Sequence, residues 1–143
     1  MTPFERAVRG EIFSLFAGGK VEVDASELVR SRGWDRYRVE ESLESLEAQH
    51  RISLVAGTHR VLMAHPFAGL DTGYQAHIDT RSWFANCAWD ALAIVALLGN
   101  GKGRATGREW DVDWSIESGR VSPNGIVHLL VPARQFWDDI GFT

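Results

Sequence analysis

The longest apolar stretch of the chain covers residues 85–98 and contains two polar side chains, Asn86 and Asp90. Its length, its composition and the Gly99-Asn100-Gly101 sequence behind it predict a helix over residues 83–98 that lies in the core. With Asp90 inside it, the stretch is too short and too polar to cross a membrane. Because the first residues also lack a basic leader followed by an apolar segment, we expect a soluble, cytoplasmic protein.

Helical spacing of apolar residues also marks the first third of the chain. Three helices with their capping or stop residues are predicted: residues 3–16 before Gly18-Gly19, a short helix from Asp24 or Ser26 to Gly33, and a helix that starts at Asp35. Two β-prone runs, residues 51–55 and 59–64, flank Ala56-Gly57-Thr58 and predict a hairpin. Three helices followed by a hairpin indicate a winged-helix-like subdomain over residues 1–65.

The second part of the chain, residues 66–143, is predicted to contain the central helix and a sheet. Residues 67–75 are expected to form a loop or a short strand, and residues 133–140 an amphipathic turn or two. Alternating polar and apolar residues at 110–116 and 127–131 predict antiparallel strands. The predicted fold class is therefore α+β: an N-terminal winged-helix-like three-helix subdomain with a β-hairpin, followed by one central helix packed on a small antiparallel sheet.

Cys87 and Asp90 lie about one turn apart in the predicted central helix, so both side chains can enter one pocket. Cys87 is the only cysteine of the sequence, which excludes an intrachain disulfide. Near a helix start, N–H groups and the helix dipole favour a thiolate, so we expect alkylating reagents to label Cys87 faster than an ordinary thiol. An aspartate among apolar neighbours tends to keep its proton, which makes Asp90 a candidate general acid. The same spacing also fits a space-filling cysteine and a surface aspartate.

The residues around this pair carry a family resemblance. The segment 83–92, WFANCAWDAL, resembles the active-site helix of the organomercurial (alkylmercury) lyases, in which an aromatic-x-x-Cys-Ala-x-Asp-x-Leu pattern holds the catalytic residues. The resemblance continues at residues 96–99, 105–107 and 129–132, and the family also begins with a winged-helix-like subdomain. It implies a lyase-like core over residues 66–143 that cleaves a carbon–mercury bond. By this resemblance, Cys87 is the thiolate that binds mercury as substrate or product, and Asp90 protonates the departing carbon.

Two positions depart from the family pattern. Gly103 stands where family enzymes carry a structural cysteine, and their second catalytic cysteine aligns immediately after Thr143, the last residue of this sequence. The sequence is therefore interpreted as a fragment cut before its second thiol or as a natural one-cysteine variant. Mercury(II) is a soft cation that prefers thiolates, so turnover through Cys87 alone needs external small thiols. No cofactor is expected, and the small-molecule partner is an organomercurial or another soft electrophile.

Two other functions stay open. A one-thiol pocket can capture a soft metal or a hydrophobic electrophile without turnover, as a binding or sensor protein does. The first 65 residues can instead form a DNA-binding winged helix, with Trp34, Arg36, Arg38 and Glu41 around the recognition helix and Arg60 on the wing. Because that helix carries four glutamates and the net charge is -4, neither nucleic acid nor a membrane is an expected partner.

The remaining candidates have structural interpretations. The five histidines show no metal-ligand spacing. Residues 99–104 are glycine-rich and basic but lack the Gly-Lys-Ser/Thr ending of a phosphate-binding loop, so they are interpreted as a helix stop and turn. Most tryptophans are expected in the core, with some enclosing Cys87, and Asp138 and Asp139 on a solvated face. The substrate and the oligomeric state are not predicted.

Overall fold

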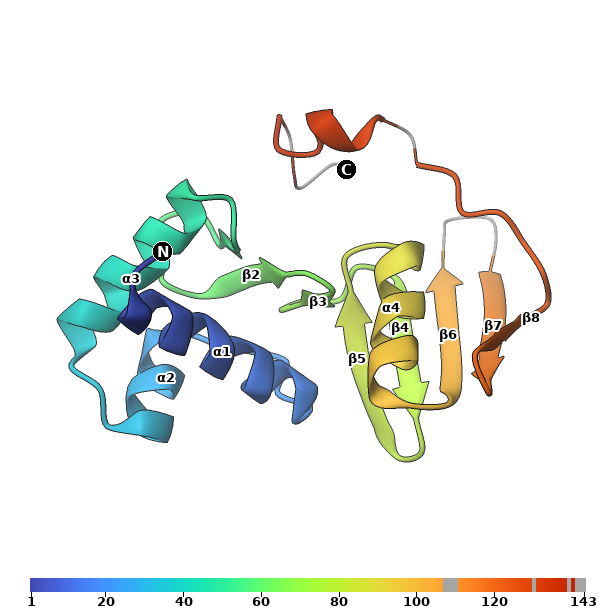
Figure 1. Cartoon of the computed structure of the whole chain (residues 1–143), viewed down its shortest axis with the longest axis horizontal. Helices are drawn as coiled ribbons and strands as arrows, with labels where there is room; N and C mark the ends of the chain where they lie inside the picture. The colour runs from blue at the N-terminus through green and yellow to red at the C-terminus, as the bar shows by residue number, and fades with distance from the viewer. Residues whose placement is uncertain (107–110, 130, 139, 141–143) are drawn as a thin grey trace.

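The computed structural model describes residues 1–106, 111–129, 131–138 and 140 (Figure 1). The helices within these ranges are α1 (Pro3–Ala17), α2 (Ala25–Arg32), α3 (Arg36–Ala48) and α4 (Ala88–Leu98), with a short 3-10 helix at Ala133–Gln135. The strands are β1 (Ser53–Leu54), β2 (Val61–Ala64), β3 (Phe67–Ala68), β4 (Tyr74–Ile78), β5 (Arg81–Ala85), β6 (Gly101–Thr106), β7 (Asp111–Glu117) and β8 (Arg120–Ser122). No helix among these residues is both long enough and apolar enough to span a membrane.

The first three helices begin where the sequence predicts, and α1 and α2 end before the predicted glycines, Gly18 and Gly33. Thr2 and Glu5 form a capping box at the start of α1, and the Asp24 side chain accepts a hydrogen bond from the N–H of Glu27 at 2.7 Å at the start of α2. Gly33 ends α2 with φ at +67°, a left-handed conformation that glycine adopts without steric penalty. The apolar faces of the three helices meet in a core of fully buried side chains: Val8, Ile12, Phe16, Leu28, Val39, Leu43 and Leu46.

The strands form one antiparallel sheet in the order β1-β2-β3-β5-β4-β6-β7-β8. The predicted hairpin is present as β1 and β2, with Leu54 opposite Val61. β2 then pairs with β3, with Ala64 opposite Phe67, so the sheet continues across the predicted boundary between residues 65 and 66. The order of three helices and a hairpin is as predicted, whereas the winged-helix-like assignment and the boundary stay predictions.

Helix α4 covers one face of the larger part of this sheet (Figure 1). Its buried residues Ala91, Ile94 and Val95 belong to one apolar cluster with inward-facing strand residues, namely Ala76, Ile78, Trp83, Ala105, Trp114 and Ile116. Burial of each large aliphatic or aromatic side chain contributes about 1.5–3 kcal/mol. The prediction of one central helix packed on an antiparallel sheet is therefore confirmed.

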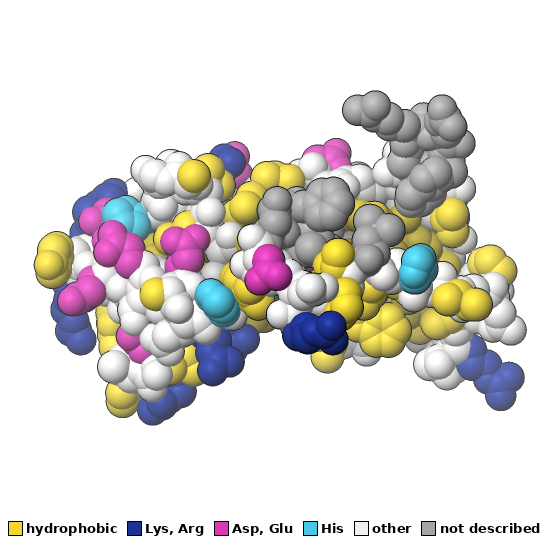
Figure 2. Space-filling view, turned by 90° about the horizontal axis from the view of Figure 1, so that it is seen from above, with side chains coloured by type: hydrophobic (Ala, Val, Ile, Leu, Met, Phe, Trp, Pro, Cys, Tyr) yellow, Lys and Arg dark blue, Asp and Glu magenta, His cyan; other side chains and the backbone are white. Residues whose placement is uncertain are grey.

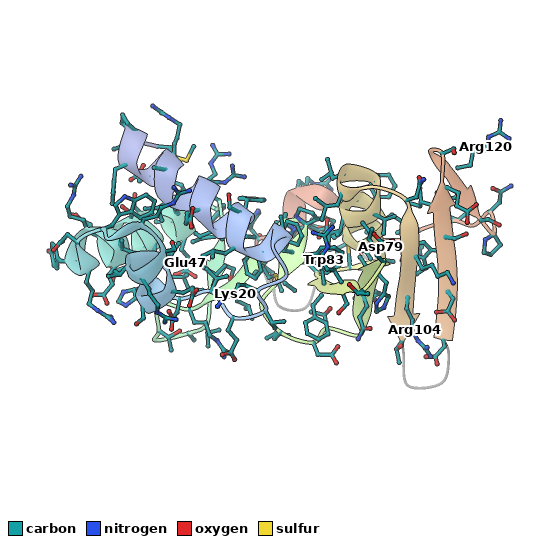
Figure 3. The ribbon with its side chains drawn as sticks, turned by 90° about the horizontal axis from the view of Figure 1, so that it is seen from below. Lys20, Glu47, Asp79, Trp83, Arg104 and Arg120 are labelled. Atoms are coloured by element: carbon teal, nitrogen blue, oxygen red, sulfur yellow. The ribbon has the colours of Figure 1, made fainter. Side chains whose placement is uncertain are left out.

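The predicted start of that helix is wrong. Residues 81–85 form β5, in which Trp83 and Ala85 are buried and Arg81 and Ser82 are exposed, and the helix begins only after Cys87. The Trp83 indole N–H donates a hydrogen bond to the Phe16 carbonyl oxygen at 2.8 Å, so β5 is tied to the end of α1 (Figure 3). The apolar residues continue from the strand into the helix, and for this reason periodicity alone does not separate the two elements.

Other strands also differ from the predictions. Residues 101–104, expected to form a turn, belong to β6, which pairs with both β4 and β7. The strand predicted over residues 127–131 is absent from the described residues 127–129 and 131, which have no regular structure. The predicted strand over 110–116 corresponds to β7, and Trp110 lies outside the described residues. The predicted amphipathic turn begins with the 3-10 helix, while Asp139 lies outside the described residues.

Candidate active site at the start of the central helix

The chain passes from β5 into α4 through Cys87, which is the N-cap residue of the helix. The backbone of Cys87 is extended, with φ at -154° and ψ at 178°, and its carbonyl oxygen accepts the first helical hydrogen bond from the N–H of Ala91 at 3.0 Å. Asp90 follows in the first turn. An N-cap side chain and a side chain three residues later lie on the same side of a helix start, so the Cys87 thiol and the Asp90 carboxyl are neighbours. The predicted proximity of the pair is present.

The Cys87 thiol is half-buried, and burial raises its pKa above the ordinary value. The backbone N–H groups of Asp90 and Trp89 act in the opposite direction, whereas the negative charge of the Asp90 carboxylate adds to the increase. Burial is the largest of these effects. Burial thus opposes the thiolate that the helix start favours, so at neutral pH the thiol form is favoured until a ligand displaces its proton.

Two side chains hold the Asp90 carboxyl, which is 14% exposed. The Asn86 amide nitrogen donates a hydrogen bond to Asp90 Oδ2 at 2.9 Å, and His65 Nδ1 lies 3.1 Å from the same oxygen. Sequence reasoning missed both partners. The position of Asn86, four residues before Asp90, was a usable signal, but His65 comes from the β2–β3 connection, 25 residues before Asp90, and no local pattern places it there.

These residues line a pocket of about 780 Å³, which is within the usual range for small-molecule sites. Its walls are mostly apolar and include Leu62, Met63, Leu70, Trp89, Leu129, Phe136, Trp137 and Ile140. Trp137 stacks on His50 with ring centroids 4.5 Å apart and meets His65 edge-on at 6.4 Å. The C-terminal segment is thereby held beside the pocket. Trp137 and the exposed Trp89 line the pocket, while Trp83 and Trp114 belong to the core as expected for most tryptophans.

Gly103, at the place of the family's structural cysteine, lies in β6 opposite Trp114 of β7. A Cβ atom at this position would come within 2.2 Å of the Trp114 indole nitrogen. The Trp114 ring therefore occupies the space in which a side chain at position 103 would stand. This departure from the family pattern is explained by packing in the core.

The other candidates lie elsewhere. His59 pairs with Glu44 of α3, His77 lies on the outer face of β4, and His128 lines a second pocket. Within the described ranges, no group of three or more His, Cys, Asp or Glu side chains is arranged to hold a metal ion. Asp138 is exposed, as predicted.

The fold and the site together define a protein with a thiol and a carboxyl on the wall of a small-molecule pocket, beside an antiparallel sheet. The profile of the alkylmercury lyase family, MerB, matches residues 67–138, which is half of the chain and includes Cys87 and Asp90. The chain belongs to the alkylmercury lyase family.

A solved structure shares the fold. The crystal structure of the mercury-bound form of MerB2 matches with a TM-score of 0.66 and 19% sequence identity, over 85% of this chain and 60% of that chain. The chain therefore spans less than two thirds of the length of that protein. No curated protein sequence matches the chain significantly.

Proposed function

We propose that this chain acts on organomercurial compounds, with Cys87 as the group that captures mercury and Asp90 as the proton donor to carbon. One observation carries the proposal: a single helix start presents a thiol and a carboxyl side by side on the wall of a largely apolar pocket. Cleavage of a carbon–mercury bond needs a sulfur ligand for mercury and a proton for carbon at the same place. Family membership and the mercury-bound state of the similar structure support this assignment.

Capture does not need a preformed thiolate. When a compound R–Hg–X enters the pocket, the Cys87 sulfur bonds to mercury, and X leaves with the thiol proton as HX. A soft metal ion binds sulfur strongly enough to displace a proton, so the raised pKa of Cys87 does not prevent this exchange. The apolar walls bury the organic group R.

Cleavage then needs a second sulfur ligand and a proton. Since this sequence has one cysteine, we assign the second ligand to an external small thiolate, R′S⁻, whose sulfur bonds to mercury as the carbon–mercury bond breaks. The electron pair of that bond takes the Asp90 proton and forms R–H. The products are Cys87–S–Hg–SR′ and an Asp90 carboxylate. A further small thiol removes mercury by exchange and returns Cys87 to the thiol.

Capture without turnover is the second candidate function. The single cysteine of the sequence favours it, because one protein sulfur suffices to bind a soft metal or a hydrophobic electrophile. A binding or sensor protein of this kind would use the same pocket and Cys87, but it would not need the proton of Asp90.

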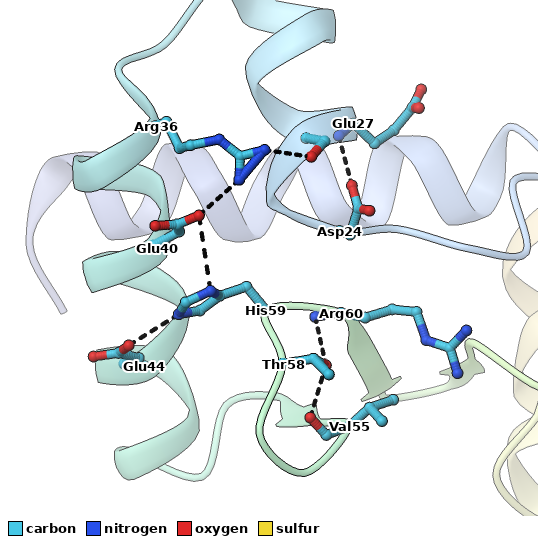
Figure 4. A network of polar contacts seen from close by, with 10 residues as sticks. Asp24, Glu27, Arg36, Glu40, Glu44, Val55, Thr58, His59 and Arg60 are labelled. Carbon is cyan, nitrogen blue, oxygen red and sulfur yellow. Dashed lines mark hydrogen bonds and ion pairs between the residues drawn. The ribbon is translucent and has the colours of Figure 1, made fainter.

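DNA binding by the first part has less support, because several charged side chains of its candidate recognition helix, α3, form ion pairs within the protein (Figure 4). Arg36 contacts Glu40 at 2.8 Å, and His59 contacts Glu44 at 2.9 Å. On the face shown in Figure 2, acidic and basic side chains are interspersed over the helical part. Such a surface releases few counterions from a phosphate backbone, so we do not propose nucleic acid as a partner.

A phenylmercury compound tests the proposal. We expect one equivalent to bind to Cys87, seen as an adduct by mass spectrometry, and benzene to be released slowly and only with an added small thiol. Cys87→Ser should abolish both, because a hydroxyl is a hard ligand. Asp90→Asn should keep the adduct and abolish release, while the exposed Asp138→Asn should keep both. Undiminished capture by Cys87→Ser would contradict the proposal, and capture without release by the unchanged chain would favour the binding protein.

A further inference from the structure

Three polar atoms form a closed triangle at the Asp90 carboxyl. Asn86 Nδ2 lies 2.9 Å from Asp90 Oδ2 and 3.1 Å from His65 Nδ1, and His65 Nδ1 lies 3.1 Å from Asp90 Oδ2. All three distances are within the range of hydrogen bonds. The capture and cleavage steps use the carboxyl of Asp90, but they give no role to the other two side chains.

The protons of this triangle can be counted. The Asn86 amide donates one N–H to Asp90 Oδ2, whereas His65 Nδ1 has a single site in the ring plane, which either carries a proton or accepts one. The contact between His65 Nδ1 and Asp90 Oδ2 joins an imidazole nitrogen to a carboxyl oxygen, so it needs a proton of its own. That proton belongs either to the carboxyl, which donates to Nδ1, or to the imidazole, which donates to the carboxylate. In both cases it takes the one site on Nδ1, so the 3.1 Å approach of Asn86 Nδ2 to Nδ1 is a contact and the Asn86 hydrogen bond is the one to Asp90. Either way, it can pass from one residue to the other.

We infer that His65 supplies Asp90 with the proton that Asp90 delivers to carbon, and that Asn86 keeps the two side chains in line. The inference rests on the proposed function and concerns the same site. Within it, His65 and Asn86 are positioning residues that act through Asp90.

The exposure of the two titratable side chains supports this direction of proton flow. Asp90 is 14% exposed and faces a pocket whose apolar walls would surround the organic group, whereas His65 is 44% exposed and stays in contact with water. The ring of Trp137 meets the imidazole edge-on and so limits its orientation. The Asn86 side chain is oriented by its hydrogen bond to Asp90 Oδ2, since its Oδ1 is buried without a hydrogen-bond partner in the described part of the chain.

The proton balance closes with water alone. After cleavage, Asp90 is a carboxylate. The proton on His65 Nδ1 moves to Asp90 Oδ2, and the imidazole takes a replacement proton from solvent. No electron is transferred, and no further reactant is needed.

The test measures benzene release from the phenylmercury adduct in excess small thiol. His65→Ala should capture mercury like the unchanged chain but release benzene roughly tenfold more slowly or worse, because Asp90 has lost its proton source. His65→Asn can restore an N–H contact to Asp90 but cannot pass a proton, so its release should also be slow. Added imidazole should raise the rate of His65→Ala towards that of the unchanged chain. His77→Ala, on the outer face of β4, is the matched control and should behave like the unchanged chain.

Release by His65→Ala or by His65→Asn at the unchanged rate would overturn the inference, and so would a failure of imidazole to accelerate His65→Ala. Circular dichroism establishes that each variant is folded, and His65→Asn decides the matter if His65→Ala does not fold. If Asp90→Asn abolishes benzene release but His65→Ala does not change it, this inference is wrong and the proposed cleavage stands. An unchanged chain that releases no benzene would remove the proposed cleavage together with the inference.

Discussion

At Cys87, two opposed effects act on one sulfur atom. The N–H groups of the helix start favour the thiolate, while burial and the neighbouring carboxylate favour the thiol. The sequence shows that Cys87 is near a helix start, but the walls that bury it come from β2, from the β3–β4 connection and from the C-terminal segment. The direction of the pKa shift therefore depends on tertiary structure, which local sequence does not contain.

Iodoacetamide should label Cys87 more slowly at neutral pH than it labels a free small thiol. The reagent reacts with the thiolate, and the raised pKa of Cys87 keeps the thiolate fraction low until the pH exceeds the ordinary thiol value. In Asp90→Asn the negative charge that adds to the increase is lost, so the pKa of Cys87 falls and labelling at neutral pH becomes faster. Asp138→Asn should label at the unchanged rate. If iodoacetamide labels Cys87 of the unchanged chain faster than a free small thiol, the helix start affects the pKa of Cys87 more than burial does.

Among the elements, those with their own start and stop residues were predicted well. Helices α1 to α3 have capping side chains in the sequence, α1 and α2 also have glycine stops, and the first hairpin has a glycine-containing loop. The junction between β5 and α4 has no such marker, because Cys87 caps the helix without a side-chain hydrogen bond and both elements are apolar. Strand β6 was missed because Gly101 and Gly103 are typical of turns, although here they permit close approach of β4 and of Trp114.

Strand β5 is joined to α1 by a single buried hydrogen bond, and Trp83→Phe tests its contribution. Phenylalanine keeps most of the ring but loses the N–H that donates to the Phe16 carbonyl oxygen, so the free energy of unfolding should fall by about 1 kcal/mol. The loss stays modest because the same oxygen also accepts the N–H of Gly19 at 2.8 Å. Urea unfolding followed by circular dichroism measures it. The control is Trp89→Phe, at a side chain that is 62% exposed, which should leave the urea midpoint unchanged. An unchanged midpoint for Trp83→Phe would show that the hydrogen bond between Trp83 and Phe16 contributes nothing to stability.

At the scale of the whole molecule, the candidate site needs both predicted parts of the chain. Cys87 and Asp90 were found from the sequence because they lie in one short segment with a family pattern. His65 belongs to the β2–β3 connection and Trp137 to the C-terminal segment, and they meet at the pocket only after the sheet and the core have formed. Long-range contacts of this kind leave no local signal, so the pocket and its proton-supplying side chain could not be predicted.

The same contacts predict how the molecule unfolds. The sheet continues from β2 into β3, and the ring of Phe67 stacks on that of Phe16 with centroids 5.8 Å apart, so the two predicted parts share one core. We expect one cooperative transition in urea, with the same midpoint by circular dichroism, which reports mainly on α1 to α3, and by fluorescence, because five of the six tryptophans follow residue 82. Phe67→Leu should lower both midpoints equally and reduce the free energy of unfolding by roughly 1 kcal/mol. Trp89→Phe is the surface control for that shift. Two separate transitions, or a shift seen by one probe alone, would show that residues 1–65 and 66–143 fold as independent units.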